Sequence, residues 1–200
     1  MIVAVSQRVV IDARTGERRD ALDRRWPIFL RHAGLLPLAV PNMPDIAFSL
    51  LDVFRPQGIV LTGGDDLANL GGASPERDET ELALLAHARH HALPLLGVCR
   101  GMQVIQSCFR VKLERVDGHV ASTQAIQFDG RRAIVNSYHN FGSRETAPGL
   151  TICGVADDGV VKAVRADSEP IIGIMWHPER IDPARAEDLA LFRTFFGASP

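Results

Sequence analysis

The stretch Leu93–Phe109, LPLLGVCRGMQVIQSCF, indicates how the whole chain folds. Leu93–Val98 is a short apolar run of the kind found in buried strands. Cys99 follows this run directly, and Gly101–Phe109 continues with the pattern of a helix. A strand that passes at once into a helix predicts a sharp turn with Cys99 at its apex.

Two glycines flank this turn. Gly97 and Gly101 lie two residues before and two residues after Cys99, the G-x-Nu-x-G spacing of hydrolase nucleophile elbows. The dipole of the following helix favours the thiolate, which is the reactive form of cysteine. The backbone N–H of Arg100 can then donate to an oxyanion that forms beside Cys99. A free cysteine is more often a buried structural residue, but the paired glycines favour a nucleophile here.

A thiol nucleophile needs a base, and the C-terminal motif Met175–Glu179, MWHPE, offers one. His177 and Glu179 stand at positions i and i+2, where a predicted strand ends. In an extended chain, which Pro178 favours, these two side chains face the same way. Of the seven histidines only His177 combines a strand terminus with a carboxylate at i+2. We therefore predict a catalytic triad of Cys99, His177 and Glu179.

A second oxyanion donor is expected from the loop Thr62–Asp66, TGGDD, in which Gly63 and Gly64 allow close backbone approach. A phosphate-binding loop is the rival interpretation. It is weaker, because two aspartates follow the glycines and no Lys-Ser/Thr pair is present. The sequence has no C-x-x-C or H-E-x-x-H motif. We expect neither a metal nor another cofactor.

The order of elements predicts an α/β fold with a doubly wound, mostly parallel sheet. The predicted strands of this sheet are Ile2–Ser6, Pro37–Val40, Gly58–Thr62, Leu93–Val98 and Ile171–Trp176. The predicted helices are Asp20–Ala33, Pro75–His91, Gly101–Phe109 and Ala184–Phe196. Four further strand-like runs predict a small antiparallel addition: Gln124–Phe128, Arg132–Asn136, Thr151–Gly154 and Val160–Val164. We expect a single domain over residues 1–200.

Composition narrows the functional classes. A net charge of −2 and a pI near 6.4 argue against a nucleic-acid-binding surface. No apolar run reaches the roughly 20 residues of a membrane span, and the first residues resemble a strand, not a signal peptide. Three cysteines are too few for a disulfide framework, so we expect a cytoplasmic protein. Cys108 and Cys153 are expected in the core, with Trp26 and Phe29 as packing residues.

The motifs GVCRGMQ and MWHPE together resemble the class I glutamine amidotransferases. The run PERDETELALLAHARHHALPLLGVCRGMQVIQ, with LTGGDD before it and VNSYHNF after it, is similar to the γ-glutamyl hydrolase branch of that family. The resemblance covers about residues 58–180. It implies a flavodoxin-like fold and hydrolysis of a γ-glutamyl amide by the predicted triad. It also implies an oxyanion hole formed by the N–H groups of Gly64 and Arg100. The implied substrate-binding residues are Gly63, Gln103, Ser137, Tyr138, His139 and Asn140.

Within this branch, the chain is shorter than γ-glutamyl-γ-aminobutyrate hydrolases, and His139-Asn140-Phe141 replaces their usual His-His-Gln. The Ser6-Gln7-Arg8 start and GIMWHPER are more similar to γ-glutamyl-CDP-amidate hydrolases, which release cytidine diphosphoramidate for capsular polysaccharide modification. Arg8 follows the first strand at its carboxyl end, where ligands of open α/β sheets bind. A pyrophosphate suits guanidinium donors. Other arginines follow in the same segment: Arg14, Arg18, Arg19, Arg24 and Arg25.

Three alternatives stay open. The chain could hydrolyse an amine conjugate of the γ-glutamyl-γ-aminobutyrate type, or it could be a glutaminase that delivers ammonia to a separate synthase. A non-catalytic binding module is the third, against which the complete Cys-His-Glu set argues. The expected partners are a small-molecule γ-glutamyl substrate and, in the glutaminase case, a synthase; neither nucleic acid nor a membrane is expected. His119, in a Gly-flanked loop, is expected at the surface.

Overall fold

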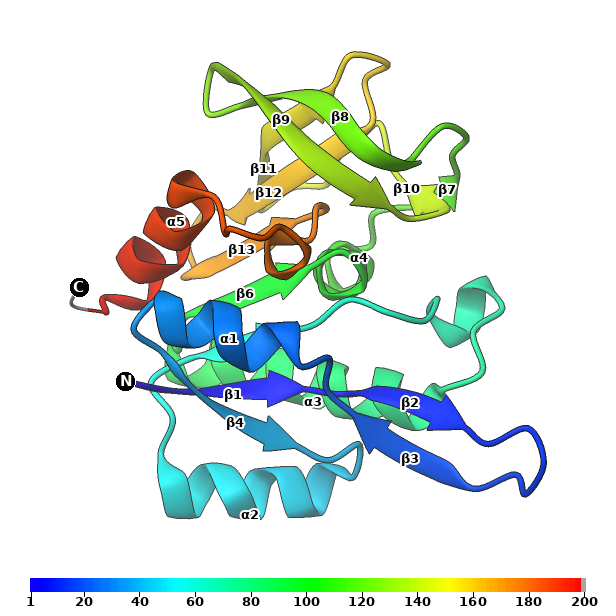
Figure 1. Ribbon diagram of the computed structural model, residues 1–200, viewed down its shortest axis with the longest axis vertical. Helices are drawn as coiled ribbons and strands as arrows, with labels where there is room; N and C mark the ends of the chain where they lie inside the picture. Colours follow the sequence, from blue (N-terminus) through cyan, green and yellow to red (C-terminus); the bar gives the residue numbers. More distant parts are fainter. Residues whose placement is uncertain (199–200) are drawn as a thin grey trace.

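The computed structural model describes residues 1–198. Its central strands are β1 (Ile2–Ser6), β4 (Leu36–Val40), β5 (Ile59–Leu61), β6 (Leu95–Val98) and β13 (Ile171–Ile174). They form a parallel sheet in the order β4-β1-β5-β6-β13 (Figure 1). The strands β5, β6 and β13 are wholly buried, as expected for a parallel sheet covered on both faces.

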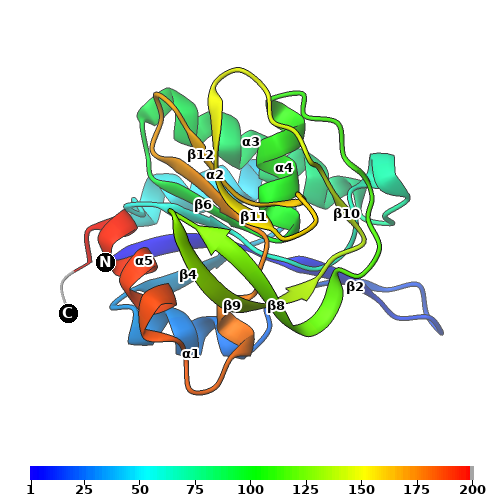
Figure 2. The ribbon, with the colours of Figure 1, turned by 90° about the horizontal axis from the view of Figure 1, so that it is seen from above.

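Helices cover this sheet in two layers. One layer consists of α1 (Arg25–His32) and α5 (Ala186–Phe196), and the other of α2 (Pro44–Phe54), α3 (Pro75–His91) and α4 (Arg100–Cys108). Figure 2, seen from above, shows the two layers on opposite sides of the strands. Two short 3-10 helices, η1 (Ala68–Leu70) and η2 (Pro178–Arg180), lie in loops. The arrangement is doubly wound, as predicted.

Beyond β13 the sheet continues with antiparallel strands. These are β12 (Val161–Ala166), β11 (Leu150–Ala156), β8 (Val120–Phe128) and β9 (Arg131–Tyr138), in the order β13-β12-β11-β8-β9. A further small pair consists of β7 (Glu114–Arg115) and β10 (Phe141–Gly142). The predicted fold class, a flavodoxin-like α/β sheet with an antiparallel addition, is confirmed.

Two predicted elements differ near the N-terminus. The helix expected from Asp20 begins only at Arg25, because β3 (Arg18–Ala21) pairs with β2 (Arg8–Ile11) as an antiparallel hairpin. The carboxylate of Asp20 accepts hydrogen bonds from the backbone N–H (2.9 Å) and side-chain amide (2.6 Å) of Asn42, which fixes this strand instead of a helical turn. Helix α2 was not predicted at all. It begins at Pro44. Proline is favoured at the first position of a helix, because the N–H that it lacks would have no partner there.

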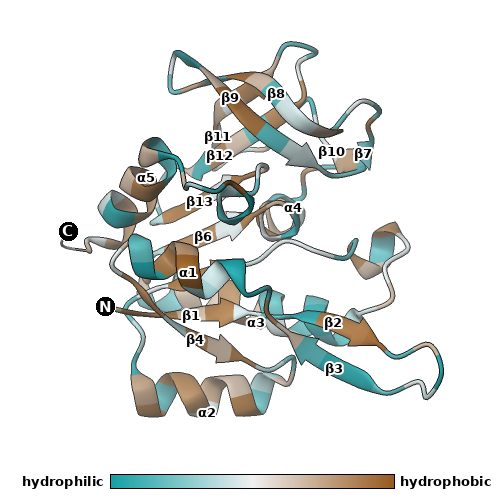
Figure 3. Cartoon of the chain, viewed as in Figure 1, coloured by the Kyte–Doolittle hydropathy of each residue, from teal (hydrophilic) through white to brown (hydrophobic). Residues whose placement is uncertain are grey.

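The core lies between the sheet and its two helical layers. Trp26 and Phe29 are 2% exposed, and Phe29 packs edge-on against Phe192 of α5 with ring centroids 4.9 Å apart. Their predicted packing role is confirmed. Figure 3 shows hydrophobic strands in the centre of the molecule and a hydrophilic β3 at its edge. Among the helices of residues 1–198, none combines the length and apolarity that crossing a membrane requires.

Candidate active site

Cys99 occupies the turn between β6 and α4. Its backbone has φ 52° and ψ −103°, a conformation that non-glycine residues rarely adopt. A Cβ added at Gly97 would lie 2.5 Å from the backbone of Gly101, and one added at Gly101 would lie 2.3 Å from the carbonyl oxygen of Leu61. The two glycines are therefore required for the helix to pass so close to β5 and β6. The predicted sharp turn is present, with Cys99 at its apex.

His177 and Glu179 meet at the end of β13. His177 Nδ1 lies 2.8 Å from Glu179 Oε1, and both side chains are almost fully buried. The chain between them is not extended, so that part of the prediction is wrong. Pro178 opens the 3-10 turn η2, because its fixed φ also suits the first position of a helix. The carboxylate reaches the imidazole from within this turn.

The protonation of His177 depends on its neighbours Cys99 and Glu179. Burial lowers the pKa of His177, but the negative charge of Cys99, its hydrogen bond to the imidazole, and Glu179 outweigh burial and raise that pKa to about 9. At neutral pH His177 is then an imidazolium beside Cys99. Such a pair supplies both a nucleophile and a proton donor.

The glycine loop after β5 lies against the same imidazole. A Cβ added at Gly63 would lie 2.4 Å from His177 Cε1, so only glycine permits this contact. Gly64 follows with φ +133°, again a conformation that favours glycine. Since β5, β6 and β13 are parallel neighbours, their carboxyl ends bring the loop, the cysteine turn and the histidine together.

The segment from Asn136 to Phe141 borders Cys99 on another side. Cys99 Sγ lies 3.8 Å from the carbonyl oxygen of Tyr138, and the side-chain amide of Gln103 donates to the carbonyl of Phe141 at 3.0 Å. Ser137 and His139 are buried, while Asn140 and part of Tyr138 are exposed. The ring of Tyr138 lies 5.9 Å from that of His177. The structure therefore places Tyr138 against Cys99 and links Gln103 to the same segment through Phe141.

A buried lysine, which the sequence did not reveal as a site residue, underlies this segment. Lys162 Nζ lies 3.0 Å from Ser137 Oγ and 2.6 Å from His139 Nε2. His139 Nδ1 donates to the carbonyl of Phe141 at 2.9 Å, so its Nε2 accepts from the lysine. Burial lowers the pKa of Lys162 to about 7, although Asp158 and Cys99 oppose this effect. The only available signal was a lysine within the otherwise apolar run Val160–Val164.

The prediction that His119 lies at the surface is wrong. Its side chain is buried, with Nε2 3.0 Å from Asp158 Oδ2 and its ring 5.0 Å from that of His139. The carbonyl of His119 accepts from Ser137 Oγ at 2.8 Å. Strands β8 and β9 together cover it, which the glycine next to it in sequence did not reveal.

Two adjoining hollows open beside Gly63 and Glu179. The first, about 30 Å³, is bounded by Arg8, Asp23, Gly64 and Arg180, among others. The second, about 140 Å³, shares Glu179 and Arg180 with the first. Its other lining residues are Arg25, Ile28, Phe29, His32, Ile181, Asp182 and Ala184.

The predicted contact residue Arg8 is thus at the site, where it also pairs with Asp65 at 2.8 Å. Two of the other arginines of its segment form ion pairs away from these hollows. Arg18 pairs with Glu76, and Arg19 with Glu17. Arg25 lines the second hollow while pairing with Asp23 at 2.6 Å.

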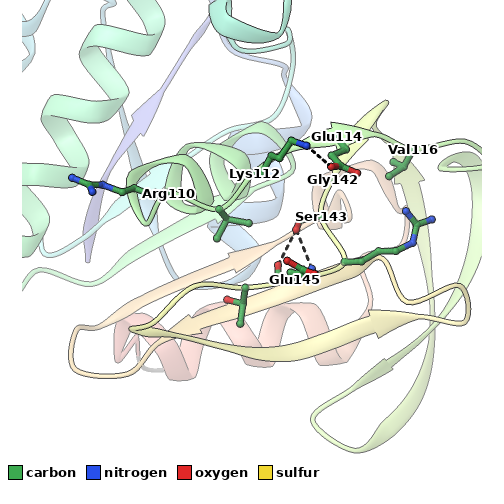
Figure 4. Close-up of a pocket in the computed structure, with 10 residues that line it drawn as sticks. Arg110, Lys112, Glu114, Val116, Gly142, Ser143 and Glu145 are labelled. Carbon is green, nitrogen blue, oxygen red and sulfur yellow. Dashed lines mark hydrogen bonds and ion pairs between the residues drawn. The ribbon is translucent and has the colours of Figure 1, made fainter.

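A separate pocket of about 400 Å³ lies beside β7 and β10 (Figure 4). Lys112 and Glu114, which form an ion pair at 2.8 Å, lie on its wall together with Ser143. None of Cys99, His177 and Glu179 lines it. The chemistry is therefore to be sought at the carboxyl ends of the parallel strands and not in this larger pocket.

Comparison with known proteins shows the family of this chain. The model of the family "Glutamine amidotransferase class-I" matches residues 31–197. The chain belongs to this family. Gamma-glutamyl-CDP-amidate hydrolase of Campylobacter jejuni is 28% identical to it over 183 residues, which cover 90% of each chain. Gamma-glutamyl-gamma-aminobutyrate hydrolase of Escherichia coli O157:H7 is 27% identical and covers 92% of this chain and 88% of its own length. The resemblance to the γ-glutamyl hydrolase branch is confirmed.

Solved structures support the fold. A crystal structure described as a GMP synthase component from Thermoplasma acidophilum superposes with a TM-score of 0.75 at 20% identity. The match covers 99% of this chain and 93% of that one. At 20% identity this likeness shows only that the two chains share a fold.

Proposed function

We propose that this glutamine amidotransferase hydrolyses a γ-glutamyl amide, with Cys99, His177 and Glu179 as its catalytic triad. The observation that carries the proposal is the buried contact of His177 Nδ1 with Glu179 Oε1 at 2.8 Å, beside Cys99 and with the pKa of His177 raised to about 9. This geometry supports the roles of nucleophile for Cys99, base for His177 and orienting residue for Glu179.

In this mechanism the Cys99 thiolate attacks the γ-carbonyl carbon, and the carbonyl oxygen becomes an oxyanion. The backbone N–H groups of Gly64 and Arg100 stabilise this oxyanion, an effect worth about 10²–10³ in rate for one donor. The His177 imidazolium gives its proton to the departing nitrogen as the C–N bond breaks. His177 then takes a proton from water, which attacks the γ-glutamyl thioester and releases glutamate and the Cys99 thiolate.

We further propose that the leaving group carries phosphate, as in γ-glutamyl-CDP-amidate. Arg8, Arg25 and Arg180 are among the residues that line the hollows beside Gly64 and Glu179. Guanidinium groups bind pyrophosphate oxygens in bidentate fashion. A pyrophosphate would compete with the carboxylates that Arg8 and Arg25 now contact. The relative from Campylobacter jejuni bears this activity in its name. We also propose a role in capsular polysaccharide modification in the cytoplasm.

The test is glutamate release by the purified chain alone from four substrates: γ-glutamyl-CDP-amidate, γ-glutamyl-γ-aminobutyrate, a γ-glutamyl anilide and glutamine. We expect the nucleotide amide to give the highest kcat/KM. Cys99→Ala should abolish release and Cys153→Ala should not, with both variants folded. Preference for the aminobutyrate conjugate would redirect the assignment to amine catabolism. Slow turnover of glutamine alone would point to a glutaminase that needs a synthase. Release by Cys99→Ala would refute the mechanism.

A further inference from the structure

Beneath the glycine loop lies a buried arginine that the mechanism above does not use. Arg77 belongs to α3 and is 0% exposed. Its guanidinium donates to the carbonyl of Thr62 at 2.8 Å, to the hydroxyl of Thr62 at 3.0 Å, and to the carbonyl of Gly63 at 3.0 Å. Two successive carbonyl groups of the loop therefore point toward the same cation.

This contact fixes the direction of the next N–H group. In a trans peptide the carbonyl and the N–H point in opposite directions. Since the carbonyl of Gly63 faces Arg77, the N–H of Gly64 faces away from α3. The loop packs on its other side against His177, where a Cβ at Gly63 would meet the imidazole. The N–H of Gly64 is thereby directed away from Arg77.

The other donor residue is tied to the same network through Glu81. This carboxylate is 0% exposed and accepts from Arg77 Nε at 2.9 Å, from Ser6 Oγ at 2.7 Å and from the guanidinium of Arg100. Arg100 also donates to Asp78. The side chain that follows the nucleophile is thus anchored to the carboxylate that anchors Arg77.

Burying two guanidinium groups is costly. Desolvation lowers the pKa of Arg77 to about 10 and that of Arg100 to about 9, so both remain cations at neutral pH. Buried ion networks contribute little to stability compared with apolar packing of the same volume. A positional role accounts for this cost better than a contribution to stability does.

We propose that Arg77, held by Glu81, is a positioning residue that fixes the Gly64 N–H of the oxyanion hole relative to Cys99. The proposal rests on the function proposed above. It adds that the helix of the PERDETE motif acts on the reaction through the loop carbonyls, without contact to substrate.

The test compares Arg77→Lys and Arg77→Gln with wild type. Lysine keeps the charge but cannot reproduce the fork that reaches both carbonyls. We expect kcat for glutamate release to fall at least tenfold in Arg77→Lys and about 10²–10³-fold in Arg77→Gln, with KM changed less than about threefold. Alkylation of Cys99 by iodoacetamide needs no oxyanion hole, so its rate in Arg77→Lys should stay within about threefold of wild type. Arg89→Gln is the matched control, since this arginine of the same helix pairs with Glu169 at the surface.

Crystal structures of wild type and Arg77→Lys complete the test. We expect the Gly63–Gly64 peptide to be reoriented in the variant. A wild-type orientation together with wild-type kcat would overturn the proposal, as would parallel losses of kcat and alkylation rate with a lowered melting temperature. If wild type releases no glutamate from any substrate, the proposed function fails. The peptide orientation then decides the positioning role alone, and an unchanged peptide refutes it.

Discussion

The side chain of Asn136 holds the main chain of His177 from both directions. Its Oδ1 accepts from the N–H of His177 at 2.7 Å, and its Nδ2 donates to the carbonyl of His177 at 2.8 Å. Asn136 belongs to β9, which is the edge strand of the nine-stranded sheet. His177 lies shortly after the end of β13, which is the central strand of that sheet. The antiparallel addition thus reaches back to fix the residue that we propose as the base.

Replacing Asn136 should therefore impair catalysis more than substrate binding. We expect Asn136→Ala to lower kcat by about 10–100-fold, because a displacement near 1 Å at a catalytic group can cost that much. Asn136→Asp should also lose activity, since a carboxylate cannot donate to the His177 carbonyl. Steady-state kinetics well below the melting temperature check this, with the exposed Asn69→Ala as control. A kcat within twofold of wild type in folded Asn136→Ala would contradict it.

Glu179→Gln should change the pH dependence of the reaction. Glu179 helps to raise the pKa of His177 to about 9, so its removal lowers that pKa. The imidazolium then loses its proton at lower pH, and the alkaline limb of kcat/KM should move toward neutral pH. We expect kcat itself to fall by roughly 10²–10⁴-fold, as when the orienting acid of a related triad is neutralised.

The measurement for Glu179→Gln is a pH profile of kcat/KM between pH 6 and 10. The control is Glu187→Gln, which alters an exposed carboxylate on α5. An alkaline limb at the wild-type pH in Glu179→Gln would show that Glu179 does not act on the charge of His177.

The turn at Cys99 could be predicted because its cause is local. Gly97 and Gly101 leave one tight path from strand to helix, and that requirement is visible in the sequence. Helix α3 was predicted with its observed bounds, Pro75–His91, since a proline at its start and acidic residues in its first turn mark the beginning.

Features that depend on distant partners could not be predicted. Strand β3 has the sequence RRDA, without apolar alternation, and exists because β2 and Asn42 pair with it. Lys162 is buried because β9 places Ser137 and His139 over it. The contact of Glu179 with His177 was predicted from an extended chain, yet a 3-10 turn makes it. The residue types indicated this pair correctly, but the backbone between them depends on packing.

Gly63→Ala should disable the site with little effect on the rest of the fold. A Cβ there would lie 2.4 Å from His177 Cε1, so the imidazole or the loop must move. We expect kcat to fall at least about 10²-fold. Gly142→Ala is the control, because the nearest atom to its Cβ would be in the side chain of Val160, at 3.2 Å. Equal kcat values in the two variants, measured with matched melting temperatures, would argue against close packing of the loop on the base.

Lys162→Met should alter how stability depends on pH. The pKa of Lys162 is about 7 in the folded protein, against an ordinary value of 10.5. Between these values the unfolded chain binds more protons, so wild-type stability rises with pH across the window from 7 to 10.5. The variant lacks this gain. Its free energy of unfolding should therefore fall, relative to wild type, by up to about 1.4 kcal/mol per pH unit over that window.

Urea unfolding at pH 7, 8, 9 and 10 measures this difference. The ionisable neighbours of Lys162, among them Cys99, His139 and Asp158, are present in both proteins, so the difference between the two curves reports chiefly on Lys162 itself. Lys112→Met is the control, because Lys112 is exposed and Glu114 raises its pKa instead of lowering it. If the curves of wild type and Lys162→Met run parallel from pH 7 to 10, then Lys162 keeps its proton throughout. A full positive charge then lies beneath the segment from Asn136 to Phe141 over this whole pH range.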